Sequence, residues 1–433
     1  MHSERQAGHS ERQAGHSERQ AGHPQRQAGG PAAFVPALEG MRALAAVGVM
    51  TTHVAFQTGA VDGSILGAVW GRFDMAVALF FALSGFLLWR PHADAARDLA
   101  RKPPGVVRYL RHRVVRIWPA YVVVVVVVLM LLPDARPASA TVWLANLTLT
   151  QVFVPLSLTA GLTQMWSLSV EVSFYLALPL FAWLLVRLRG ERARWRIPLL
   201  LAAAVLSLGW AWVADALPLA AGVEAKNWLP GHLPWFISGL ILAELVVSRS
   251  GTVAARMGSR PWPMAGVAAV AFALSCTELA GPTGLAPLAP WQFAVKMVLG
   301  AVLGFALLGP LVLGPPRPHP FLDSAPMQAL GRWSYAIFIW HLAVLAAVFP
   351  LAGVIPFSGS MALVWCLTLL LTIGVSAASY SWIEDPARRW LRRSERRSAA
   401  ARSAATTSQV HPDQPPRHSD RAPRDENDRQ QSR

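Results

Sequence analysis

The chain has 433 residues, of which 54% are hydrophobic and only 15% are charged. This balance is too apolar for an ordinary soluble protein. A formal net charge of +15 is compatible with nucleic-acid binding, but the arginines gather in alternate loops between hydrophobic runs, which is typical of membrane proteins. We therefore expect a lipid bilayer as partner, with some attraction to anionic headgroups, and no nucleic acid.

The two ends of the chain differ from its hydrophobic middle. Residues 1–33 contain HSERQAG three times in tandem, a seven-residue period that lacks the apolar positions of a coiled-coil seam. Residues 391–433 are rich in Ser, Arg, Pro, Asp and Gln. Both tails are predicted to be disordered, and residues 34–390 are predicted to form one transmembrane domain.

The hydrophobic residues of this domain fall into ten runs of about 17 to 24 residues, a length that spans a bilayer as a helix. The runs lack the alternation of barrel strands, so the expected fold is all-α, a polytopic membrane bundle of about ten transmembrane helices. The predicted spans are residues 36–56, 74–90, 116–132, 165–187, 197–214, 231–248, 262–280, 290–313, 328–349 and 360–382.

The charge distribution predicts how these helices are oriented. Arginines fill the segments 90–116, 187–196 and 249–260 and the C-terminal tail, whereas the loops near 134–164, 215–230, 281–289 and 350–359 carry only Arg136 and Lys226. Loops rich in Arg and Lys face the cytoplasm. Both termini are therefore predicted to be cytoplasmic, and the protein is predicted to be a multi-pass component of the cell membrane.

The first hydrophobic run holds three ionisable residues, Glu39, Arg42 and His53. Arg42 and His53 are eleven residues apart, about three helical turns, and Glu39 lies on the same stripe. Charged groups at membrane depth rarely lie there without a partner or a task. His53 alone is compatible with a structural histidine near the outer interface. The shared stripe favours a catalytic set in which His53 is a general base and Arg42 and Glu39 assist.

The next run, residues 71–90, begins with Arg72 and Asp74 at the membrane level that His53 should occupy. These two residues are candidates for orienting a substrate, or they cap the helix. Ser84 and Gly85 lie deeper in the same run. Small residues at that depth favour close packing between helices, which is the expected role of this pair.

A basic segment, RYLRHRVVRIWPAY, places Arg108, Arg111 and Arg116 at the start of the third span. Topology and lipid headgroups account for most of this charge. The functional interpretation is a clamp for a phosphate-bearing cytoplasmic donor, because a guanidinium pairs with phosphate through two hydrogen bonds.

The segment QMWSLSVEVSFYLALPL carries a second intramembrane carboxylate. Trp166 precedes Ser167, Glu171 and Tyr175, whose spacing of four residues puts them on one helix face. The carboxylate of Glu171 needs a partner such as an arginine or a protonated histidine. These four residues are candidates for substrate binding, with an essential scaffold role as the alternative.

The segment LGRWSYAIFIWHLAVL adds Ser334 and His341, seven residues apart on one helix face. A single histidine such as His341 is more often a structural member of a bundle than a catalyst, but both residues are retained as candidates for substrate binding. Cys276 and Cys366 lie in hydrophobic runs without metal-ligand spacing, so no metal site is expected.

Six segments, in this order, resemble the acyltransferase-3 family of bacterial integral membrane acyltransferases. The family's arginine, ten intervening residues and histidine correspond to Arg42 and His53, its acidic position to Glu39, and its intramembrane glutamate to Glu171. The chain departs at Val172, where the family often has a second acidic residue, and in the longer spacing of its FDMAVALFF motif. The segments are LEGMRALAAVGVMTTH, FDMAVALFFALSGFLL, RYLRHRVVRIWPAY, MWSLSVEVSFYLALP, LGRWSYAIFIWH and IEDPARR.

This resemblance implies an O-acyltransferase that uses cytoplasmic acyl-CoA as co-substrate and has no bound cofactor. The acceptor that it implies is a hydroxyl of a glycan or a glycosylated natural product, such as a surface polysaccharide or a macrolide. The alternative from another class is a proton-coupled transporter or exporter of a glycan or antibiotic, which intramembrane Glu, Arg and His would suit. Against it, the sequence lacks the internal repeat and interrupted helix pair of carriers.

Overall fold

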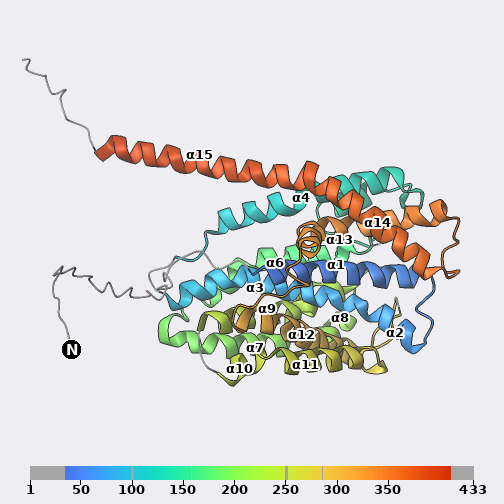
Figure 1. The fold of residues 1–433 in the computed structure, drawn as a ribbon, viewed down its shortest axis with the longest axis horizontal. Coiled ribbons are helices and arrows are strands. Elements are labelled where there is room, and N and C mark those ends of the chain that lie inside the picture. Colours follow the sequence, from blue (N-terminus) through green and yellow to red (C-terminus); the bar gives the residue numbers. More distant parts are fainter. Residues whose placement is uncertain (1–34, 99–101, 156, 249–251, 285, 411–433) are drawn as a thin grey trace, which may run out of the picture. The chain divides into compact units, whose positions relative to one another are not determined.

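The computed structural model describes residues 35–98, 102–155, 157–248, 252–284 and 286–410, with side chains up to residue 401. Within these ranges the chain forms helices and turns and no β-strand. The longer helices (Figure 1) are α1 (Pro36–Gln57), α3 (Ala76–Arg97), α4 (Val106–Leu131), α6 (Met165–Leu184), α7 (Arg196–Leu208), α9 (Leu229–Ser248), α11 (Pro261–Ser275), α12 (Pro290–Leu313), α13 (Ala325–Ala352), α14 (Met361–Ser379) and α15 (Asp385–Val410). Shorter helices are α2 (Ile65–Arg72), α5 (Ala140–Leu147), α8 (Trp210–Ala216) and α10 (Val253–Gly258).

Each of the ten predicted spans contains a helix, which confirms the all-α membrane bundle. Among the described residues, eight helical segments are long and apolar enough to cross a membrane, two fewer than predicted. The two predicted spans outside this count are α1, which carries Glu39, Arg42 and His53 among its apolar residues, and α11, which has only 15 residues.

Helices α3 and α9 approach each other backbone to backbone. A Cβ atom added to Gly239 of α9 would lie 1.9 Å from Ala82 O, and one added to Gly85 of α3 would lie 2.2 Å from Phe236 O. Only glycine leaves room for this approach, which lets the two backbones pack directly. The predicted packing role of Gly85 is thereby confirmed.

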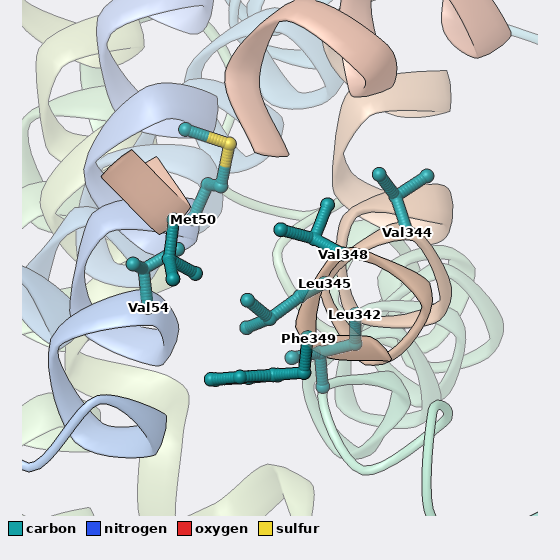
Figure 2. Packing of buried hydrophobic residues seen from close by; sticks show 8 residues of the cluster. Met50, Val54, Leu342, Val344, Leu345, Val348 and Phe349 are labelled. Carbon is teal, nitrogen blue, oxygen red and sulfur yellow. The ribbon is translucent and has the colours of Figure 1, made fainter. Parts of the chain in front are cut away.

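Helix α1 packs against α13 through a cluster of buried apolar side chains (Figure 2). Met50 and Val54 of α1 lie beside Leu342, Leu345 and Val348 of α13, and each of these side chains is at most 2% exposed. In lipid, helix association depends on such van der Waals contact rather than on removal of apolar surface from water. The cluster fixes the rotation of both helices and so decides which polar residues face each other.

A buried carboxylate that the sequence analysis did not single out joins α3, α7 and α9. Glu244 of α9 is fully buried, and its Oε1 accepts hydrogen bonds from Trp89 Nε1 and Arg196 Nε, each at 2.7 Å. Its Oε2 pairs with Arg97. Two guanidinium groups and one indole therefore surround a single carboxylate, which is the compensation that a buried charge requires.

The C-terminal tail that was predicted to be disordered from residue 391 is helical up to Val410, because α15 continues from α14 through a π-helical turn at Tyr380–Glu384. Ala, Arg and Glu favour helix, and ion pairs spaced by four residues add support, as between Arg389 and Asp385 at 2.7 Å. Figure 1 shows α15 alongside α4. The predictions for residues 1–33 and 411–433 lie outside the described residues.

Candidate active site

The polar stripes of α1 and α13 face each other. Arg42 Nε donates a hydrogen bond to Ser334 Oγ at 3.2 Å, and His53 Nδ1 lies 3.3 Å from His341 Nε2. Glu39 Oε2 is 3.9 Å from Arg42 Nε, too far for a hydrogen bond but close enough to balance its charge. Four of the predicted site residues are thus paired across one helix interface, at two separate levels.

A cavity lies at the first of these levels, between α1, α3, α4, α6 and α13. Three arginines and one carboxylate line it, so its charge favours an anionic ligand. The polar lining residues are Arg42, Ser84, Arg113, Arg116, Ser167, Glu171, Tyr175, Ser334 and Tyr335.

Glu171 is held in the wall of this cavity by hydroxyl groups. Tyr175 Oη donates to Glu171 Oε1 at 2.6 Å, and Ser84 Oγ donates to the same oxygen. Ser167 also lines the cavity, so the predicted common face of Ser167, Glu171 and Tyr175 is confirmed. Ser84 was predicted only as a packing residue, because nothing in the sequence indicates that α3 passes α6 at this point.

The hydrogen bonds of the two histidines decide which ring atoms carry protons. His53 Nδ1 is 2.8 Å from Val49 O, and His341 Nδ1 is 3.2 Å from Ile337 O. A carbonyl oxygen only accepts, so in the neutral rings both Nδ1 atoms carry hydrogen. His341 Nε2 then presents a lone pair to His53, and His53 Nε2 keeps its own lone pair. His53 is partly exposed and His341 is fully buried, so His53 is the accessible base of the pair.

Aromatic side chains separate the cavity from the histidine pair. Phe80 and Phe338 line the cavity, with ring centroids 6.1 Å apart. The Phe338 ring is also 6.0 Å from that of His341. A reacting group in the cavity therefore meets Phe338 before it reaches His341 and His53.

The predicted arginine clamp is only partly realised. Arg116 lines the cavity, but Arg108 pairs with Glu395 of α15 at 2.9 Å, and Arg111 hydrogen-bonds Ser394 at 2.9 Å. Arg113, which the sequence analysis passed over, takes their place in the cavity wall. The spacing of three positions between Arg113 and Arg116 is visible in the sequence. Which face of α4 meets the cavity depends on how the helices pack, and the sequence does not show it.

Other predicted residues lie outside the cavity. Asp74 forms an ion pair with Lys296 of α12 at 2.6 Å, a lysine within a membrane helix that the sequence analysis missed. Arg72 is buried, and its Nη2 donates to Gly281 O at 2.6 Å. The Trp166 ring lies beside that of buried His232 in a tilted arrangement, with 5.0 Å between centroids. None of these three predicted residues lines the cavity, and each has a partner elsewhere in the bundle.

Asp74 nevertheless belongs to the surroundings of His53. Thr52 Oγ1 donates to Gly71 O at 2.8 Å, and a Cβ on Gly48 would lie 3.1 Å from Ala76 Cβ, so α1 touches the chain on both sides of Asp74. Among the described residues, no cluster of three or more His, Cys, Asp or Glu suits a metal ion.

Comparison with known proteins identifies the family. The family model described as an acyltransferase domain of the acyltransferase-3 type matches residues 35–381. The chain belongs to the acyltransferase-3 family. It is thus a membrane O-acyltransferase, and the resemblance drawn from its motifs is confirmed.

Curated members of the acyltransferase-3 family extend the match over most of the chain. The acyltransferase MdmB of Streptomyces mycarofaciens is 30% identical over 326 residues, which are 72% of this chain and 79% of MdmB. The peptidoglycan O-acetyltransferase OatA of Listeria monocytogenes is 23% identical over 82% of this chain, and the O-acetyltransferase OatA of Staphylococcus aureus is equally similar. The chain spans only 56% and 57% of these two proteins. No solved structure matches.

Proposed function

We propose that this protein transfers an acyl group from cytoplasmic acyl-CoA to a hydroxyl of a glycan or a glycosylated natural product. The observation that carries the proposal is the intramembrane cavity in which Arg42, Arg113 and Arg116 face Glu171, one aromatic layer away from the His53–His341 pair. An anionic donor and a general base, at neighbouring levels of one bundle, are what this reaction needs. The acceptor classes that we propose are surface polysaccharides and macrolides.

The proposed orientation places the arginine-rich end of the bundle in the cytoplasm. Arg108 and Arg111 at the N-terminal end of α4 and the arginines of α15 lie at this end, which the positive-inside pattern assigns to the cytoplasm of the cell membrane. Acyl-CoA would enter there, and its thioester would advance toward the histidine pair. The acceptor would meet it from the His53 side.

The proposed chemistry uses His53 Nε2 as the base. It takes the proton from the acceptor hydroxyl, whose oxygen forms a bond to the thioester carbonyl carbon. The carbon–sulfur bond breaks, and the CoA thiolate leaves with the proton returned by the imidazolium. His341 Nε2 accepts the hydrogen of His53 Nδ1 and so orients the ring, as the partner of a catalytic histidine commonly does.

Arg42 acts on the donor and not on the reacting carbonyl in this scheme. It lies eleven positions before His53, which is about 16 Å along a helix. Its hydrogen bond to Ser334 and its position in the cavity wall suit a group that binds donor oxygens. Glu39 and Glu171 limit the positive charge of the three arginines.

The experiment that tests the proposal compares cells that express the chain with cells that lack it, using mass spectrometry of their surface glycans and of a supplied macrolide. We expect one of these acceptors to gain an acyl mass that mild alkali removes, as an ester requires. Cells that express a His53→Ala chain should not produce this species. Export of the acceptor without a change in mass would contradict the proposal and favour a transporter.

A further inference from the structure

A second cavity follows the first along α3, α4 and α6. Helix α3 lines the first cavity with Leu87 and Leu88 and the second with His92, Ala95 and Ala96. Helices α4 and α6 also contribute residues to both cavities. On all three helices, the residues nearer the arginine-rich end line the second cavity. The α4 and α6 residues are Arg113, Arg116, Ile117, Ser167, Leu168, Glu171 and Tyr175 in the first cavity, and Val106, Tyr109, Pro179, Ala182 and Trp183 in the second.

A contact between two tyrosines links the walls of the two cavities. Tyr109 lines the second cavity, and its Oη donates to Tyr175 O at 3.2 Å. Tyr175 lines the first cavity, and the Arg113 guanidinium lies 5.7 Å above its ring. The two cavities therefore follow one another along α3, α4 and α6, from the arginine-rich end of the bundle to Glu171, and together they are called the trough.

The chemistry of the second cavity differs from that of the first. Its wall is mostly apolar and carries flat side chains, Trp183, His92 and Tyr109. Arg189 and Arg196 also line it, but Arg189 donates to Ala95 O and Arg196 pairs with Glu244. Neighbouring arginines of the same segment, Arg187, Arg192 and Arg194, are exposed. Flat apolar surfaces with a basic rim favour an aromatic base that carries phosphate groups.

We infer that this second cavity holds the nucleotide head of the acyl-CoA donor, so that the whole trough binds one extended molecule. This inference rests on the proposed function, because it places a part of the proposed donor. The thioester must lie at the deeper end, toward His53, which leaves the adenine and the phosphates at the arginine-rich end. Trp183 would stack on the adenine.

The Arg113 guanidinium, at the junction between the two cavities, supports this assignment. Arg113 Nε is buried and has no hydrogen-bond partner among the described residues. An unpaired buried donor is unfavourable, and a phosphate oxygen at the junction would satisfy it. In CoA, the diphosphate joins the nucleotide to the pantetheine arm. With the nucleotide in the second cavity and the arm in the first, the diphosphate would lie at the junction between them.

The test measures binding of labelled CoA to the purified full-length protein, because binding does not require the acceptor to be known. In Trp183→Ala we expect the Kd for CoA to rise about tenfold, the loss typical of one base–aromatic stacking contact. Adenosine 3′,5′-bisphosphate should displace CoA from the wild-type protein and should do so less well from Trp183→Ala. Trp183 is 67% exposed, so its removal should not disturb folding.

Two further variants make the outcome decisive. Ala182→Trp fills the second cavity and should also weaken CoA binding, whereas Trp262→Ala removes an exposed tryptophan that lines neither cavity and should not. Unchanged CoA affinity in both Trp183→Ala and Ala182→Trp would overturn the inference, and is the result expected if a lipid chain fills this cavity. A wild-type protein that binds no CoA would instead overturn the proposed donor, and the inference with it.

Discussion

Replacing His53 by alanine is expected to lower acyl transfer by about 10²- to 10⁴-fold, the usual contribution of a general acid–base group. The reason is that His53 Nε2 is the accessible lone pair of the histidine pair, while its Nδ1 is engaged by Val49 O and His341. The measurement is the initial rate of labelled acyl transfer in membranes that contain equal amounts of each variant.

A matched control for this variant is His319→Ala. His319 lies between α12 and α13 and lines neither cavity, so its replacement should leave the rate unchanged. CoA binding should remain normal in His53→Ala, because His53 does not contact the donor cavity. A His53→Ala protein that transfers acyl groups at the wild-type rate would refute the assigned base.

Replacing Glu244 by glutamine is expected to destabilise the bundle by about 3–5 kcal/mol, because removing one partner leaves uncompensated buried charges. Arg196 and Arg97 share this carboxylate, and their side chains are only 3% and 18% exposed. We expect a lower Tm in detergent and a smaller yield of folded protein.

The matched variant for this prediction is Glu395→Gln. Glu395 also has two basic partners, Arg108 and His112, but the Arg108 side chain is 74% exposed. Exposed ion pairs contribute little to stability, so Tm should stay close to that of the wild type. Equal Tm values for the Glu244 and Glu395 variants would show that burial of the Glu244 cluster does not matter.

The sequence predicts the elements of this fold well, because helix period and bilayer length are local properties. The stripe of Arg42 and His53 and that of Ser334 and His341 were each visible on their own helices. Their mutual contact was not, since it depends on how the apolar cluster rotates α1 against α13.

Partners that lie far apart in the chain account for what the sequence could not show. Lys296 meets Asp74 across 222 positions, and hydropathy alone treats such a lysine as an interruption of a helix. The predicted clamp role of Arg108 and Arg111 failed for a related reason. Their contacts come from α15, in a segment whose polar composition resembles a disordered tail although its helix propensity is high.

The measurement that tests the central claim most directly uses proteoliposomes that contain the purified protein and the acceptor identified by mass spectrometry. Acetyl-CoA and propionyl-CoA, labelled in the acyl group, are supplied on one side of the bilayer at a time. We predict that label reaches the acceptor as an ester only when the donor is on the side of the arginine-rich ends of α4 and α15, and only with His53 intact. Label that stays on CoA while the acceptor crosses the bilayer unmodified would contradict the account.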